Sequence, residues 1–242
     1  MPGPGQGPDD GAQEQELAQQ EVFDYMVAKV PVKPEVADGT VKGSQFRTPL
    51  LEFSGSCAGC AETAYARLLT QLFGDRMYIT NATGCSSIWG GPAATSPYTR
   101  NAEGKGPAWA NSLFEDNAEH GYGLYLGQKA IRERLCAKLQ DMAAAEKTPA
   151  ETKALIEKYF ETYDDGTANA EAVKALIPAL EQAAKDGCPV APEILQEQEY
   201  LNKKSVWVFG GDGWAYDIGF GGVDHVLASK MSRKRSMPLT WP

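Results

Sequence analysis

A five-residue apolar run, Ser205-Val-Trp-Val-Phe209, leads directly into Gly210-Gly-Asp-Gly213. A short apolar run that ends in glycines indicates a buried strand. In open α/β sheets, ligands bind outside the carboxyl ends of the strands. The glycines provide free backbone N–H groups and Asp212 provides a carboxylate, so phosphate groups with Mg²⁺ could bind here. The alternative is an ordinary tight turn, because glycine and aspartate dominate turns.

Helix and strand patterns elsewhere in the chain predict an α/β fold. Apolar spacing predicts helices over residues 20–26, 61–73, 113–139 and 217–228, the third with a weak point at 121–127. Strand or extended structure is expected over residues 45–54 and 77–80. Residues 81–107 are dense in glycine, proline and small polar residues and predict a loop. Loops of this length in a compact domain usually carry function.

Residues 140–204 differ in character from the rest of the chain. Ala, Glu and Lys dominate there, and Pro149, Gly166 and Gly187 interrupt the segment. This pattern predicts three helices in an inserted helical subdomain that carries no candidate chemistry.

The two ends of the chain also differ from its middle. Residues 1–19 are rich in Pro, Gly, Gln and Asp, which predicts disorder. Residues 230–242 form an irregular basic tail. The folded domain is therefore expected over residues 20–229.

The charge and composition exclude several classes of partner. The 242 residues carry a net charge of −9, which argues against nucleic acid or an acidic membrane surface as a partner. No apolar run approaches the length of a membrane span, and the N-terminus has no secretory signal pattern. Five cysteines are too few for a secreted disulfide scaffold. The chain is expected to be cytoplasmic, or organellar in a eukaryotic host.

Three cysteines lie in segments suited to a metal site. Cys57 and Cys60 form a CxxC pair, which can bind one metal ion or two corners of an iron–sulfur cluster. Cys85 lies in a small-residue segment that allows backbone to approach a bulky group. Zinc, a cluster, a redox dithiol and buried free thiols all remain open. A fourth ligand would be Cys136 or Cys188, or would lie outside this chain, although Cys136 is expected to be a core thiol and Cys188 lies within the helical insertion.

Other residues have two readings each. Glu62 begins the helix after the cysteines, where a carboxylate interacts favourably with the helix N-terminus or could face a cofactor. Both histidines lie in helical stretches and are expected to be structural: His120 and His225. Three tryptophans of glycine-rich segments could cover a ligand or a domain interface, or pack in a core: Trp89, Trp109 and Trp214.

Together these motifs resemble one family. They are Leu51-Glu-Phe-Ser-Gly-Ser-Cys-Ala-Gly-Cys-Ala-Glu-Thr63, Ile79-Thr-Asn-Ala-Thr-Gly-Cys-Ser-Ser-Ile-Trp-Gly-Gly91 and Gly210-Gly-Asp-Gly-Trp-Ala-Tyr-Asp-Ile-Gly219. Over residues 20–229 the chain resembles the C-terminal thiamine-diphosphate domain of pyruvate:ferredoxin (flavodoxin) oxidoreductase. The resemblance implies the thiamine-diphosphate-binding fold, in which helices flank a parallel sheet.

The resemblance also implies cofactors and residue roles. The implied cofactors are thiamine diphosphate, Mg²⁺ and a [4Fe–4S] cluster. By this likeness Cys57, Cys60 and Cys85 bind the cluster, and Glu62 and the Cys85 segment lie against thiamine. Asp212 binds Mg²⁺, and its neighbours contact the cofactor: Gly211, Gly213 and Trp214.

The family's reaction sets the expected function. The family converts pyruvate and coenzyme A to acetyl-CoA and passes electrons to ferredoxin or flavodoxin, and its complete enzyme is expected to be a homodimer. The family pattern continues beyond the equivalent of Ser229 with a strand, an Asn-Thr-Gly-Gly loop and a fourth cluster cysteine. The fold is therefore expected to be incomplete at its C-terminal end, and the lone chain inactive. A split subunit, a truncated or misjoined gene product, and a non-catalytic iron–sulfur or zinc module are the alternatives.

Overall fold

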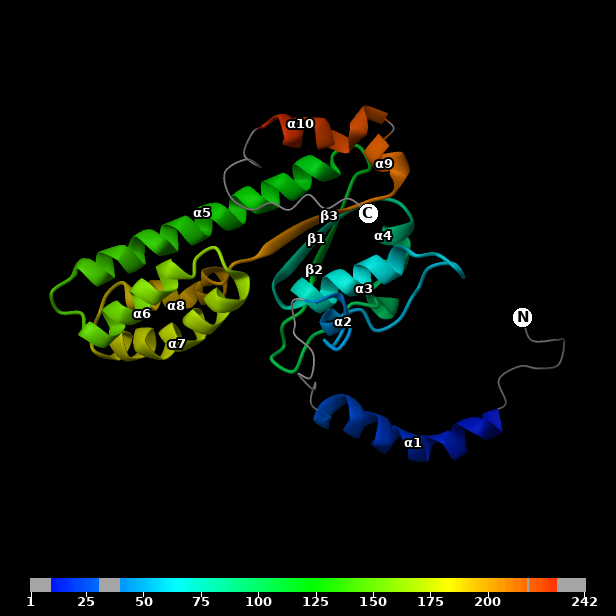
Figure 1. Ribbon diagram of the computed structural model, residues 1–242, viewed down its shortest axis with the longest axis horizontal. Coiled ribbons are helices and arrows are strands. Elements are labelled where there is room, and N and C mark those ends of the chain that lie inside the picture. The colour runs from blue at the N-terminus through cyan, green and yellow to red at the C-terminus, as the bar shows by residue number, and fades with distance from the viewer. Residues whose placement is uncertain (1–9, 31–39, 217, 230–242) are drawn as a thin grey trace. The chain divides into compact units, whose positions relative to one another are not determined.

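The computed structural model describes residues 10–30, 40–216 and 218–229 of the chain (Figure 1). The chain divides into two compact units, residues 1–48 and residues 49–242, and each is considered by itself. The predicted disorder of residues 1–9 and the predicted basic tail of residues 230–242 lie outside the described residues.

A three-stranded parallel sheet forms the centre of the second unit. Its strands lie in the order β2-β1-β3, and they are β1 (Met77–Ala82), β2 (Ala108–Ser112) and β3 (Ser205–Phe209). In the central strand, Ile79 is opposite Trp109 on one side and Trp207 on the other. The predicted bounds of β3 are confirmed, and β1 is two residues longer than predicted.

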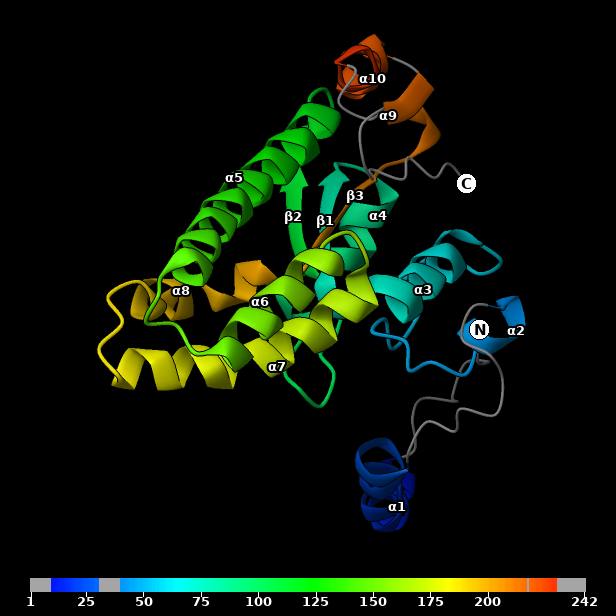
Figure 2. The same ribbon diagram turned by 60° about the vertical axis from the view of Figure 1, so that its left-hand side comes forward.

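Helices cover both faces of this sheet, as Figure 2 shows. On one face lies α5 (Asn117–Ala144), which approaches so closely that a Cβ at Gly121 would lie 2.6 Å from Val208 Cγ2. On the other face lie α3 (Glu62–Phe73) and α4 (Cys85–Gly90), where the Phe73 and Trp207 rings are 5.1 Å apart. The expected α/β class is confirmed, and the arrangement is consistent with a thiamine-diphosphate-binding type of fold.

The helical insertion has a hydrophobic core of its own. It combines the second half of α5 with α6 (Ala150–Glu161), α7 (Gly166–Lys185), α8 (Ala191–Gln196) and a 3₁₀ turn at Gln198–Leu201. Ten buried side chains make up the core: Leu135, Leu139, Met142, Ile156, Tyr159, Val173, Leu176, Leu180, Ile194 and Leu201. The three predicted helices and their boundary residues are thus confirmed.

A half-buried arginine, Arg132, joins the helices of the insertion. The Arg132 guanidinium lies 3.8 Å from the centre of the Tyr163 ring and donates hydrogen bonds to Leu201 O and Asn169 Oδ1. The Tyr159 hydroxyl also donates to Leu201 O, and burial raises the pKa of this phenol. These contacts stabilise the junction of α5, α6 and α7 and belong to the structure rather than to chemistry.

The insertion also contains an exposed proline inside a helix, which allows a test of its contribution to stability. Pro178 lies inside α7, where it removes one backbone hydrogen bond and clashes with the preceding turn. Pro178→Ala should raise the free energy of unfolding by about 2 kcal/mol, since the gain in the helix exceeds the loss of chain rigidity in the unfolded state. Pro192, near the start of α8, is the matched control because no helical bond is lost there. Equal denaturant midpoints for Pro178→Ala and the parent chain would contradict this account.

Several predicted elements are wrong in type or extent. Residues 10–19 are not disordered but helical, as part of α1 (Asp10–Lys29), because alanine, glutamate and glutamine are good helix formers even without an apolar stripe. Residues 45–54, predicted as strand or extended structure, form no regular strand: a turn follows the short helix α2 (Val41–Ser44), and Leu51 makes a single bridge to Tyr98.

Two further predictions need correction. The expected loop at 81–107 contains the last residues of β1, then α4 and a 3₁₀ turn at Ala93–Thr95. The expected helix at 217–228 is replaced by α9 (Asp212–Tyr216), a 3₁₀ turn (Ile218–Gly222) and α10 (Val223–Ala228). Gly221 and Gly222 have positive φ. This backbone conformation ends the 3₁₀ turn, and α10 begins at the next residue.

The long helix α5 also differs from its prediction. It runs unbroken through residues 121–127 and continues to Ala144. In this part of the chain, packing against the sheet favours glycine at Gly121, so a residue that weakens isolated helices is retained.

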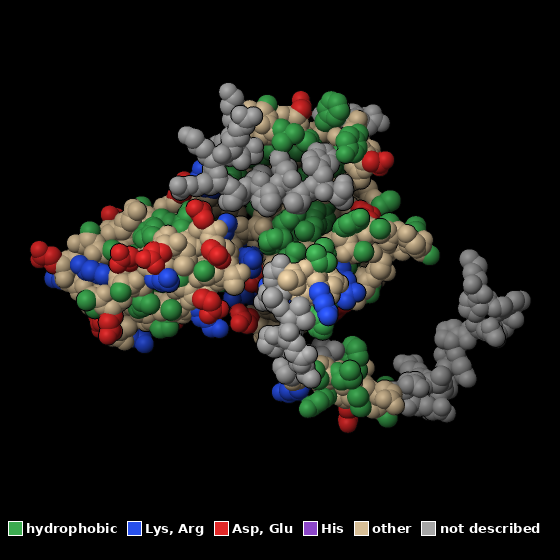
Figure 3. Space-filling view, in the orientation of Figure 1, with side chains coloured by type: hydrophobic (Ala, Val, Ile, Leu, Met, Phe, Trp, Pro, Cys, Tyr) green, Lys and Arg blue, Asp and Glu red, His purple; other side chains and the backbone are tan. Residues whose placement is uncertain are grey.

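Charged side chains of both signs cover the insertion on the face in Figure 3. Every helix among the described residues is either too short or too polar to cross a lipid bilayer.

Candidate functional site

The loops that follow the three strands meet at one edge of the sheet. Since the strands are parallel, their carboxyl ends point the same way, and Figure 2 shows α4, α9 and α10 at that end. The helices α6, α7 and α8 lie toward the opposite end. The segments of Cys85 and Asp212 therefore border the carboxyl edge, while the insertion is remote from it; the CxxC loop precedes α3 and is considered below.

A buried asparagine connects all three strands at this edge. Asn117, the first residue of α5, is fully buried. Its Nδ2 donates to Phe209 O at 2.8 Å, at the end of β3, and to Thr80 O at 3.5 Å in β1. Its Oδ1 accepts from Ser112 Oγ at 2.8 Å, at the end of β2. One side chain thus fixes the relative positions of the strand ends from which the site loops leave.

The Gly-Asp-Gly segment after β3 presents a carboxylate and open backbone. Asp212 is exposed at the start of α9, and a Cβ built at Gly211 would meet no atom within 4 Å. Trp214 lies differently, because it is only 7% exposed and packs in a core cluster with Ala82 and Ala118. The Trp214 indole packs on the core side of this segment, so Gly211, Asp212 and Gly213 are its solvent-accessible residues.

Along the sequence, the CxxC loop comes directly before α3, and the Cys85 segment comes directly after β1. Cys57 and Cys60 are exposed in the loop before α3, where the Cys60 N–H donates to Cys57 O at 3.0 Å and Gly59 has φ +80°. Cys85 is exposed as the first residue of α4. All three thiols are free, and soft thiolates of this kind bind iron–sulfur clusters and zinc.

The other two cysteines belong to the insertion. Cys136 and Cys188 are partly buried and pack against the insertion's core. The expectation that Cys136 is a core thiol is confirmed. Neither residue lies on a loop of the carboxyl edge, so the fourth ligand that the sequence leaves open is not supplied by them.

Within residues 10–30, 40–216 and 218–229, no three His, Cys, Asp or Glu side chains surround one point closely enough for a single metal ion. A cubane cluster makes a different demand, because each of its thiolates binds a separate iron atom. The assignments of Cys57, Cys60, Cys85, Glu62 and Asp212 to cofactors therefore stay predictions.

Hydroxyl groups close the base of the CxxC loop. Ser54 Oγ lies 2.7 Å from Thr63 Oγ1, and Ser56 Oγ lies 3.0 Å from Ser54 Oγ and 3.3 Å from Thr63 Oγ1. The chain before the loop pairs with the segment at Tyr98, where Glu52 N–H donates to Pro97 O at 2.8 Å. Hydrogen bonds between hydroxyl groups therefore hold the two ends of the CxxC loop together.

Glu62 faces two aromatic residues. Its Oε2 accepts a hydrogen bond from Trp89 Nε1 at 3.2 Å. Burial, and next the negative charge of Glu62, raise the pKa of the Tyr98 phenol. The Tyr98 hydroxyl is buried and has no hydrogen-bond partner in the part of the chain that the structure describes. A neutral phenol at this position avoids repulsion with the carboxylate.

The remaining aromatic and imidazole side chains are mostly structural. Trp89 is buried in a cluster with Leu51, and Trp109 is half-buried and donates to Asn81 Oδ1 at 3.2 Å. His120 is half-buried and His225 is exposed, and neither lies in a cluster of metal-ligating groups among the described residues.

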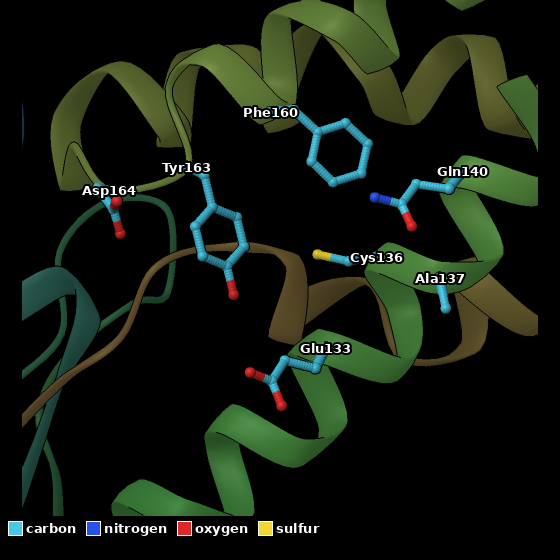
Figure 4. Close-up of a pocket in the computed structure, with 7 residues that line it drawn as sticks. All are labelled: Glu133, Cys136, Ala137, Gln140, Phe160, Tyr163 and Asp164. Atoms are coloured by element: carbon cyan, nitrogen blue, oxygen red, sulfur yellow. The ribbon is translucent and has the colours of Figure 1, made fainter. Parts of the chain in front are cut away.

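A shallow cavity of about 420 Å³ lies elsewhere, in the insertion (Figure 4). Figure 4 shows the Cys136 sulfur beside Phe160 and Tyr163, with Glu133 and Gln140 at the side of α5. Burial raises the pKa of the Cys136 thiol, which disfavours the reactive thiolate. None of the predicted site residues lines this cavity.

Sequence reasoning missed the residues that position the site. Asn117 begins a helix and Asn81 falls at the start of the predicted loop 81–107, both common positions for asparagine, so no local signal marked them. The hydrogen bond between Glu62 and Trp89 joins residues 27 positions apart. Only the pairing of the segments in space brings them together.

Comparisons with known proteins agree with the geometry. No protein-family model matches the chain. It is 54% identical over 210 residues to a pyruvate-flavodoxin oxidoreductase of Klebsiella pneumoniae, covering 86% of this chain and 18% of the relative. It is 54% identical over 202 residues to a pyruvate:ferredoxin oxidoreductase of Moorella thermoacetica, covering 82% and 17%.

A mitochondrial pyruvate dehydrogenase [NADP(+)] of Euglena gracilis is 50% identical over 207 residues, which cover 83% of this chain and 11% of the relative. The chain thus spans less than a fifth of the length of these relatives. At such identity over most of the chain, the chain and each of these relatives share one ancestry and one fold in the matched region. The chain is therefore homologous to one segment of the pyruvate-flavodoxin and pyruvate:ferredoxin oxidoreductases.

Proposed function

We propose that the chain is the part of a pyruvate:ferredoxin or pyruvate:flavodoxin oxidoreductase that binds thiamine diphosphate, Mg²⁺ and three corners of a [4Fe–4S] cluster. The observation that carries this proposal is that the segments of Cys85 and Asp212 leave the carboxyl ends of β1 and β3, while Gly55, just before the CxxC pair, lies against Trp89 of α4. The carboxyl edge is where open α/β sheets bind ligands. The names of the relatives support the reaction class.

The residues present fit these groups. Cys57, Cys60 and Cys85 are free, exposed thiols, and thiolates are the usual ligands of iron–sulfur clusters. The exposed Asp212 carboxylate is a hard oxygen ligand of the kind that Mg²⁺ prefers. The open backbone at Gly211 leaves room for a diphosphate beside it.

Thiamine diphosphate, when bound, would supply a nucleophilic carbon that makes decarboxylation of a 2-oxo acid possible, and a cluster would supply a one-electron acceptor. The chain's own part is to hold these groups. Asp212 and the neighbouring backbone N–H groups fix the orientation of the diphosphate end. Glu62 and the Cys85 segment lie against the thiamine, on the side of the cluster cysteines. Trp214 packs in the core beneath the Asp212 segment and supports it.

The surface around the edge supports a role within a larger assembly. One large exposed hydrophobic residue follows each strand: Ile88 at 73% exposed, Leu113 at 69% and Tyr216 at 67%. Large exposed apolar side chains in the segments after all three strands are consistent with an interaction surface at this edge. We infer that the remaining segments of the oxidoreductase cover this edge, and that the complete enzyme is a homodimer that uses pyruvate, coenzyme A and a ferredoxin or flavodoxin in the cytoplasm or an organelle.

Anaerobic reconstitution with iron and sulfide tests this function. The expected result is a broad visible absorbance, and an EPR signal after reduction, from a [4Fe–4S] cluster. Binding of zinc with no cluster formation would overturn the proposal in favour of a zinc module. In a second assay, thiamine diphosphate, Mg²⁺, pyruvate and coenzyme A should reduce a viologen dye only when the remaining segments are added, since the chain corresponds to less than a fifth of the length of its relatives.

A further inference from the structure

Trp89 contacts both ends of the CxxC loop. Before the cysteines, a Cβ at Gly55 would lie 3.0 Å from Trp89 Cβ, so the loop backbone rests on this residue. After the cysteines, Glu62 Oε2 accepts the hydrogen bond from Trp89 Nε1 at 3.2 Å. The indole is only 6% exposed. One residue, Trp89, thus contacts the loop both before Cys57, at Gly55, and after Cys60, at Glu62.

The same residue is rigidly connected to Cys85. Residues four apart on a helix lie on one face, so Cys85 is one turn before Trp89 on that side of α4. The start of α4 is fixed by Gly84 N–H, which donates to Ser87 Oγ at 2.8 Å. Asn81 Nδ2 donates to Ser86 Oγ at 2.7 Å and links α4 to the central strand. A continuous chain of contacts therefore runs from the sheet through α4 to the CxxC loop.

We propose that Trp89 is a positioning residue: its indole N–H holds Glu62 and so fixes the Cys57–Cys60 loop against the helix that carries Cys85, before any metal is bound. The identity of the group held by the cysteines rests on the proposed function, but the clamp itself does not. Its physical benefit is preorganisation, because a loop that is already ordered loses less conformational entropy when a cluster binds.

The surroundings of Glu62 fit a permanent clamp. The carboxylate is the first residue of α3, where the helix N-terminus favours negative charge. Tyr98 packs beside it, with its ring 6.0 Å from the Trp89 ring. A hydrogen bond to a charged acceptor in such a partly buried place is stronger than one between neutral groups.

Hydrogen exchange of the metal-free chain tests the clamp directly. Trp89→Phe keeps an aromatic ring but removes the N–H donor, and it should raise the exchange of residues 54–63 by about tenfold. Trp207→Phe is the matched control, since Trp207 is also 6% exposed and its Nε1 donates to a side chain, Ser205 Oγ, at 3.0 Å. The control should leave exchange of residues 54–63 unchanged.

Two outcomes would overturn the clamp. One is unchanged exchange of residues 54–63 in Trp89→Phe. The other is an equal rise in Trp207→Phe, or a rise spread evenly over β1 and α5, which would mean general destabilisation. A further variant, Glu62→Gln, keeps an oxygen acceptor but no charge and should give a smaller rise of the same pattern.

Iron–sulfur reconstitution of the same variants separates this inference from the proposed function. If the parent chain forms a cluster, Trp89→Phe should form it more slowly and lose it faster to a chelator, while Trp207→Phe should match the parent. If the parent forms none but the exchange pattern holds, the clamp stands and the proposed function fails.

Discussion

Replacing Cys85 with serine should abolish stable cluster assembly by the chain. The three assigned thiols would bind three of the four iron atoms of a cubane, so the loss of Cys85 leaves only the CxxC pair. A serine hydroxyl is not ionised near neutral pH and is a harder ligand than a thiolate. The measurement is iron and acid-labile sulfide per chain after anaerobic reconstitution and desalting, with the visible absorbance recorded alongside.

Cys188→Ser provides the control for this change. Cys188 is a partly buried thiol in the insertion, with no place in the candidate site. Its replacement removes a thiol of the chain without touching the carboxyl edge, so iron and sulfide should stay at the parent level. If Cys85→Ser retained as much iron and sulfide as Cys188→Ser, the assignment of Cys85 as a ligand would be wrong.

The structure shows which features of Cys85 the sequence could indicate, although the loop predicted around it is a helix. Cys85 directly follows the central strand, after Thr83 and Gly84, and opens α4. A small-residue run after a buried strand is visible in sequence, and so is a CxxC pair before an amphipathic helix. Both therefore mark positions at the ends of elements, which short-range patterns can locate.

The sheet shows where such patterns end. β3 has four consecutive apolar residues after Ser205 and is predicted with its bounds, because such a run before glycines has few other structures open to it. β2 has the sequence Ala-Trp-Ala-Asn-Ser and was not predicted. It becomes a strand through its pairing with β1, a long-range contact that its own residues do not specify.

The site divides in the same way. Asp212, Cys57, Cys60 and Cys85 were predicted from local motifs, and the structure leaves them exposed. Trp214 was predicted beside the cofactor from its position in the motif, yet it is 7% exposed within a core cluster. The motif identifies the segment, but the direction of a side chain depends on what packs against it.

Replacing Asn117 with alanine should be the most destabilising polar change at this edge. The fully buried amide has three partners, Phe209 O, Thr80 O and Ser112 Oγ, and alanine leaves all three without this partner. A buried group that loses its partner costs about 1–3 kcal/mol, so the free energy of unfolding should fall by about 3 kcal/mol. Denaturant unfolding of the purified chain measures this loss.

Asn111→Ala is the matched control at the same end of the sheet. Asn111 is exposed and donates one hydrogen bond, to Thr83 Oγ1 at 3.1 Å, so water replaces its partner and the loss should stay below about 1 kcal/mol. Asn117→Asp sharpens the test, because it keeps the acceptor for Ser112 Oγ but removes the donor to Phe209 O and buries a carboxyl group. It should therefore destabilise the chain at least as much as alanine does. If both Asn117 variants unfolded at the same denaturant concentration as Asn111→Ala, the strand ends would be held by the backbone ladder alone, and the loops that carry Cys85 and Asp212 would not depend on this side chain for their relative position.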